Sequence, residues 1–132
     1  MNNIQKKQTI KVLVVDDNEV NQIVSLEMLS MLGFQADLAS DGEEALKKHV
    51  QNHYNLILMD ILMPGLSGIE TSHRIRNDLN DDNVIIISMS AGNIYEEDNN
   101  AFTNAGINDY LTKPFHTEEL KKIIQKWFSN SD

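Results

Sequence analysis

The 132-residue chain contains no cysteine. This absence excludes disulfide bonds, thiolate catalysis and zinc sites with thiolate ligands. No apolar stretch approaches the roughly 20 residues of a membrane-spanning helix, and the polar start of the chain lacks the apolar segment of a signal peptide. We therefore expect a soluble, cytoplasmic protein that makes no direct contact with a membrane.

Basic residues are scarce as well. Eleven lysine and arginine residues against 20 aspartate and glutamate residues give a net charge of −9, which opposes direct binding to nucleic acid. The chain also lacks an internal repeat and a long linker. Its length suits one domain, and we expect that domain at residues 10–129, after an N-terminal tail at residues 1–9.

Short apolar runs alternate with segments of helical periodicity along the whole chain. The runs rich in β-branched residues predict five strands, at residues 11–16, 35–39, 56–60, 84–89 and 107–111. The three near-continuous runs among them are typical of strands buried on both faces of a parallel sheet. The alternation therefore predicts an α/β fold, a doubly wound five-stranded parallel sheet with helices on both faces.

Helices are expected between these strands. Residues 19–32 carry an apolar stripe that includes Ile23, Leu26 and Leu29, and Gly33 is placed to end that helix. Three further helices are expected to start near residues 41, 67 and 117. Residues 92–106 predict a more loosely held helix, because few of their side chains can face a core.

Polar side chains stand where the apolar runs end. Asp16 and Asp17 end the first run, Asp60 ends the third, and Ser90 and Lys113 follow the last two. The carboxyl ends of parallel strands meet at one edge of a sheet, where ligands bind in folds of this type. Three neighbouring carboxylates repel one another unless a cation joins them, and a hard divalent ion with oxygen ligands is the expected partner.

These residues resemble the receiver domain of two-component response regulators. The resemblance spans about residues 10 to 129 and implies the flavodoxin-like (βα)5 fold with strand order 2-1-3-4-5. Residues 18–21 further resemble receivers attached to hybrid sensor kinases, and a single-domain receiver remains the alternative. The matching motifs are Val14-Val15-Asp16-Asp17-Asn18, Leu58-Met59-Asp60-Ile61-Leu62-Met63-Pro64-Gly65, Ser90-Ala91 and Tyr110-Leu111-Thr112-Lys113-Pro114.

The resemblance implies that Asp60 accepts a phosphoryl group from a phosphohistidine on a histidine kinase or a histidine phosphotransfer domain. Such a domain is a phosphorylatable signalling module and not an enzyme with free substrates, although it catalyses its own phosphorylation and slow dephosphorylation. The implied cofactor is Mg²⁺, held by Asp17, Asp60 and the backbone carbonyl of Leu62, with Asp16 acting through water. Lys113 would neutralise charge on the phosphoryl oxygens.

The resemblance also implies how phosphorylation would be read out. Ser90 would donate a hydrogen bond to the phosphoryl group, and Tyr110 would change rotamer as the loop after Ser90 closes. A downstream protein target would then bind the surface formed by residues 92–106, the last strand and the last helix. A cis peptide bond is implied between Lys113 and Pro114, and a monomer or weak dimer is the expected oligomeric state.

Simpler interpretations and other classes of function remain open. Taken alone, the acidic pair could be a solvated strand end followed by a helix cap at Asn18. A magnesium-dependent phosphatase is a second candidate, but Leu62 replaces its usual helper acid. A flavin or nucleotide binder lacks support without a G-x-G-x-x-G motif or P-loop, and a pure interaction module would be expected to lose an acid or the lysine. Histidines 49, 53, 73 and 116 are interpreted as solvated.

The lifetime of a phosphorylated Asp60 should depend on Leu62. Many receivers carry a polar residue at this position, which can orient water for in-line attack, whereas Leu62 cannot. Leu62→Asn is therefore expected to shorten the lifetime without lowering Mg²⁺ affinity, because the implied metal contact is a backbone carbonyl. Decay after removal of the phosphodonor measures this, and an unchanged or longer lifetime contradicts the prediction.

Overall fold

The computed structural model describes residues 10–92 and 98–128. Its sheet has five parallel strands in the order β2-β1-β3-β4-β5. This order confirms the doubly wound topology predicted above. The strands are β1 (Val12–Val15), β2 (Ala36–Ala39), β3 (Leu56–Asp60), β4 (Ile85–Ala91) and β5 (Asp109–Lys113).

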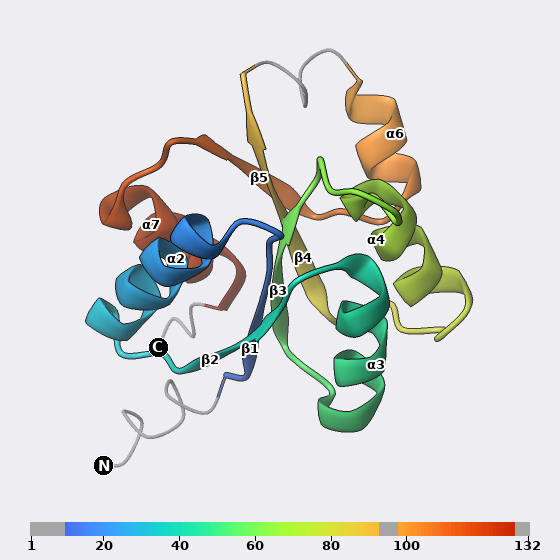
Figure 1. Cartoon of the computed structure of the whole chain (residues 1–132), viewed down its shortest axis with the longest axis horizontal. Coiled ribbons are helices and arrows are strands. Elements are labelled where there is room, and N and C mark those ends of the chain that lie inside the picture. The colour runs from blue at the N-terminus through green and yellow to red at the C-terminus, as the bar shows by residue number, and fades with distance from the viewer. Residues whose placement is uncertain (1–9, 93–97, 129–132) are drawn as a thin grey trace.

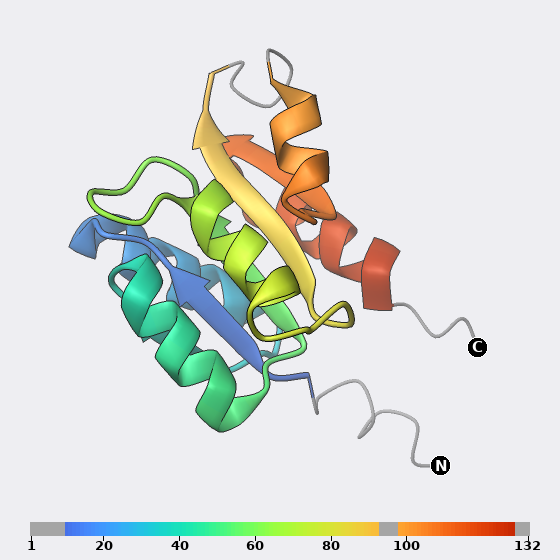
Figure 2. The ribbon, with the colours of Figure 1, turned by 90° about the vertical axis from the view of Figure 1, so that its right-hand side faces the viewer.

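Helices cover both faces of the sheet (Figure 1). They are α2 (Glu19–Met31), α3 (Gly42–Asn52), α4 (Gly68–Asn77), α6 (Asn99–Asn104) and α7 (Thr117–Phe128). Helices α2 and α7 lie on one face, and α3, α4 and α6 lie on the other, as the side view in Figure 2 also shows. Within the described part of the chain, no helix has the length and apolar character needed to cross a bilayer.

Burial on both faces explains why the first four residues of the central strand β3 are all apolar. All five of its residues are buried, and successive side chains point to opposite faces of the sheet. Ile57 and Met59 join the core beneath α3 and α4, whereas Leu56 and Leu58 join the core beneath α2 and α7. A strand covered on both faces has no solvent side on which a polar residue would be favoured.

The predicted apolar stripe of α2 was wrong at one position. Ile23 is 57% exposed, and Val20 and Val24 beside it are 67% and 43% exposed. The polar residues Gln22 and Ser25 are buried instead. The helix is therefore rotated so that polar groups near its start face the sheet edge and apolar groups face solvent.

The prediction that all four histidines are solvated was wrong for His49, which is 2% exposed. Its Nε2 lies 2.7 Å from an Asp81 carboxylate oxygen, and its Nδ1 accepts the backbone N–H of Tyr54 at 3.1 Å. An imidazole can be buried when both nitrogens have hydrogen-bond partners. Histidines 53, 73 and 116 are exposed, as predicted.

Within the described part of the predicted helix at residues 92–106, helix α6 spans Asn99–Asn104, and its Phe102 is fully buried. Ile94 and Tyr95, which were expected to face the core, lie outside the described residues. Strand β5 starts two residues later than predicted, because the N–H of Ile107 still bonds to the carbonyl of Phe102 in the closing turn of α6.

Candidate functional site

Strand register brings the predicted site residues to one edge of the sheet. Val15 in β1 pairs with Met59 in β3, so the next residues, Asp16 and Asp60, lie at the same level. On the other side of β3, Asp60 pairs with Met89, the residue before Ser90. Lys113 at the end of β5 pairs with Ala91, immediately after that serine.

Three carboxylates converge at this edge. Asp16, Asp17 and Asp60 each offer an oxygen atom, and these atoms lie within 4.8 Å of one another. The ammonium of Lys113 lies 3.3 Å from an oxygen of Asp16 and 3.3 Å from an oxygen of Asp60. Convergent carboxylate oxygens fit a hard divalent cation, and one lysine balances only part of their negative charge.

The electrostatics of Asp60 reflect this crowding. Burial raises its pKa to about 6; the charge of Lys113 opposes the increase, and the charge of Asp16 adds to it. In the metal-free protein, the ionised form of Asp60 is therefore less favourable, relative to the protonated form, than it is for an aspartate in water. A bound cation would supply the missing positive charge.

The remaining predicted site residues lie around this cluster. Ser90 is 5% exposed near the end of β4, and Tyr110 is half-buried on β5. The side chain of Leu62, in the turn after Asp60, is 67% exposed. The Lys113–Pro114 peptide bond is cis, which confirms that prediction.

Sequence reasoning missed Gln22, which contacts the site from α2. Its side-chain amide donates a hydrogen bond to the backbone carbonyl of Asp16 at 2.7 Å. The pattern of α2 contained the clue, because Ser25, Leu26 and Leu29 follow Gln22 by three, four and seven residues on the inward side. A glutamine at such a position needs a buried polar partner.

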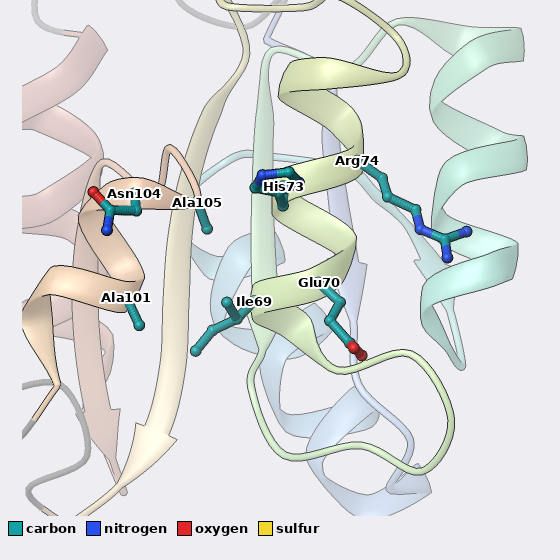
Figure 3. Close-up of a pocket in the computed structure, with 7 residues that line it drawn as sticks. All are labelled: Ile69, Glu70, His73, Arg74, Ala101, Asn104 and Ala105. Atoms are coloured by element: carbon teal, nitrogen blue, oxygen red, sulfur yellow. The ribbon is translucent and has the colours of Figure 1, made fainter.

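A separate hollow of about 330 Å³ lies between α4 and α6, away from the acidic cluster. Figure 3 shows Ile69 of α4 directed toward α6; Ala101 projects from α6, and Ala105 directly follows its last residue. The small alanine side chains leave the space between these helices unfilled. Its lining residues are Ile69, Glu70, His73, Arg74, Ala101, Asn104 and Ala105.

The fold and the acidic edge define a class of protein, and comparison with known families agrees. Residues 12–125 match the family model of the response regulator receiver domain. The chain belongs to this family and is a receiver domain of two-component signalling.

The relatives include both solved receivers and long signalling proteins. The receiver domain of sensor histidine kinase PA1611 from Pseudomonas aeruginosa, solved with a magnesium ion in its active site cleft, is 38% identical, with a TM-score of 0.78 over 89% of this chain and 96% of that one. The receiver of Ssk1 from Saccharomyces cerevisiae, solved with the histidine phosphotransfer protein Ypd1, is 32% identical, with a TM-score of 0.83 over 95% of this chain and 96% of that one.

Curated relatives are much longer than this chain. Hybrid signal transduction histidine kinase L of Dictyostelium discoideum is 36% identical in an alignment 128 residues long that covers 92% of this chain and 7% of that protein. The chain likewise spans 4% of kinase G of the same organism. Each relative therefore carries large regions with no counterpart in this sequence.

The raised pKa of Asp60 predicts a pH-dependent stability effect. The pKa of about 6 lies above the ordinary 3.8, so binding of a proton to Asp60 stabilises the folded state. This stabilisation is complete below pH 3.8 and is lost as pH rises through about 6. In metal-free buffer at pH 7, Asp60→Asn is expected to raise the free energy of unfolding by about 2 kcal/mol. This gain should disappear as pH falls toward 4, in urea titrations across that range.

Asp17→Asn is the matched control, because it removes an acid of the same cluster whose side chain is exposed. Solvent screens that charge, so its effect should be smaller. An equal gain in both variants, or a gain for Asp60→Asn that does not change with pH, would show that burial of the Asp60 charge is not the cause.

Proposed function

We propose that Asp60 accepts a phosphoryl group from a phosphohistidine on a partner protein. The observation that carries this proposal is a buried carboxylate 3.3 Å from the ammonium of Lys113, inside a cluster with Asp16 and Asp17 that can hold a divalent cation. An anionic nucleophile can approach an anionic phosphoryl group only where positive charge is concentrated. Lys113 and a cation bound by the three carboxylates would together supply that charge.

In the proposed mechanism, Asp17, Asp60 and the backbone carbonyl of Leu62 would hold Mg²⁺, and Asp16 would act through water. When bound, the ion would neutralise charge on the phosphoryl oxygens. An oxygen of Asp60 forms a bond to phosphorus while the phosphorus–nitrogen bond breaks, and that electron pair returns to the imidazole. Lys113 would contact the transferred group, so the chain would contribute mainly position and charge.

The partner is proposed to be a histidine kinase or a histidine phosphotransfer domain in the cytoplasm. The complex of Ypd1 with the Ssk1 receiver supports a phosphotransfer partner for a receiver of this shape. The long hybrid kinases among the relatives support a receiver that works within such a system, whether attached or separate. We propose that the domain acts as a monomer or weak dimer and does not hydrolyse free substrates.

Output is proposed to pass from Ser90 to the surface formed by α6, β5 and α7. Ser90 would bond to the phosphoryl group, the following loop would close, and Tyr110 would change rotamer. The hollow between α4 and α6 leaves α6 room to move on that side (Figure 3). Asp109 of β5 accepts hydrogen bonds from Lys126 and Trp127 of α7, each at 2.9 Å, so these two elements should move together.

Phosphorylation at Asp60 can be tested with Mg²⁺ and acetyl phosphate, followed by intact-mass measurement. The protein should gain one phosphoryl group, and Asp60→Asn should gain none. Asp17→Ala should keep the fold and lose both Mg²⁺ binding and phosphorylation, because it removes a proposed metal ligand. Mg²⁺-dependent labelling that persists in Asp60→Asn would rule out this acceptor.

A protein donor, as opposed to a small phosphodonor, is supported by the apolar surface beside the site. Val20, Ile23 and Val24 are exposed on the first two turns of α2, which begins just after Asp17. Leu62, two residues after Asp60, is exposed as well. Apolar side chains grouped around a polar site are typical of a surface that a protein partner covers.

The double variant Val20→Ser/Val24→Ser is expected to slow transfer from a protein donor roughly tenfold, because apolar contact area would be lost from the proposed interface. Labelling by acetyl phosphate should be unchanged. Phosphorylated Ypd1 serves as a heterologous donor, with transfer followed over time. Val50→Ser is the control, since Val50 is 52% exposed on α3. Equal slowing in the control would contradict a docking surface on α2.

A further inference from the structure

We propose that Gln22 is a positioning residue for the metal-binding loop, and that its side-chain amide sets the direction in which Asp17 presents its carboxylate. Gln22 lies on α2, is 8% exposed, and its Nε2 donates to the carbonyl oxygen of Asp16 at 2.7 Å. An apolar residue at this inward position would add to the core, so the polar choice needs a reason. The inference deepens the proposed function, because it assumes that Asp17 holds the cation.

The bonded carbonyl belongs to the planar peptide group that joins Asp16 to Asp17. A hydrogen bond to this oxygen therefore fixes the orientation of the whole peptide group, and with it the direction of the following Cα–Cβ bond. The Asp17 side chain is exposed, so packing does not hold it in place. The backbone that Gln22 anchors sets where this carboxylate points.

The other polar groups of Asp16 are also held by named partners. Its N–H donates to the carbonyl of Ala39 at 3.1 Å, and one carboxylate oxygen accepts the N–H of Asn18 at 3.0 Å. Its other carboxylate oxygen lies 3.3 Å from the ammonium of Lys113. Gln22 completes the set, so every polar group of this buried residue has a partner.

Gln22 also braces two loops at the carboxyl edge of the sheet. The same Nε2 lies 3.3 Å from the hydroxyl oxygen of Ser40, which follows β2. The N–H of Ser40 in turn donates to the carboxylate of Glu44 in the first turn of α3, at 2.8 Å. These hydrogen bonds connect the acidic loop to the start of α3.

A role in positioning and a role in packing predict different results. A methionine fills about the same space as glutamine but leaves the Asp16 carbonyl without its donor. If Gln22 only packs, Gln22→Met alters stability at most, and the folded protein binds Mg²⁺ as before. If Gln22 positions the loop, Mg²⁺ affinity falls in fully folded protein.

The experiment measures the Mg²⁺ dissociation constant by calorimetry in protein without phosphodonor. Gln22→Met is expected to bind roughly fivefold to tenfold more weakly, the equivalent of about one hydrogen bond. Ser25→Ala is the matched control, because Ser25 is 4% exposed on the same inward side of α2, and its affinity should stay within about twofold of the starting protein.

Hydrogen exchange in metal-free protein separates this inference from the proposed function. The Asn18 amide should exchange faster in Gln22→Met than in Ser25→Ala, because the loop has lost its anchor. This readout applies even if the starting protein binds no Mg²⁺, which would refute the proposed metal site alone. Unchanged exchange, unchanged affinity in Gln22→Met, or an equal loss in Ser25→Ala would each overturn the role of Gln22.

Discussion

The charge of Asp60 is the constraint around which the rest of the site is arranged. A carboxylate at the end of a buried strand loses its hydration, and two further acids beside it increase the cost. Lys113 compensates only in part, as the raised pKa shows. A site that carries this cost of a buried negative charge in the metal-free protein is suited to binding a cation, and the bound cation can then attract an anionic phosphoryl group.

The fold holds this unfavourable carboxylate in place through close backbone contacts. The N–H of Gly68 at the start of α4 donates to the carbonyl of Ile61 at 3.0 Å, just after Asp60. A Cβ at Gly68 would lie 2.2 Å from the carbonyl oxygen of Asp60, so only glycine permits this approach. The start of α4 therefore packs closely against the backbone at the end of β3, where Asp60 lies.

Helix α2 shows how a site can override ordinary amphipathic patterning. In its first two turns, Gln22 faces the acidic loop, and Val20 and Ile23 are exposed. Burial of these apolar side chains would favour the opposite rotation of the helix about its axis. Further along, Leu29 is fully buried and anchors the helix to the sheet. The C-terminal part of the helix thus packs into the core, whereas its N-terminal part contacts the acidic site.

The sequence alone determined the strands, their order through the family resemblance, and the acids, serine and lysine of the site. These features depend on local patterns: apolar runs end in polar residues, and parallel strands share one carboxyl edge. Tertiary structure alone decided which face of α2 is inward, that His49 is buried against Asp81, and that Gln22 holds the Asp16 carbonyl. The physical reason is that each depends on a hydrogen-bond partner distant in sequence or on a helix rotation, and hydrophobic periodicity records neither.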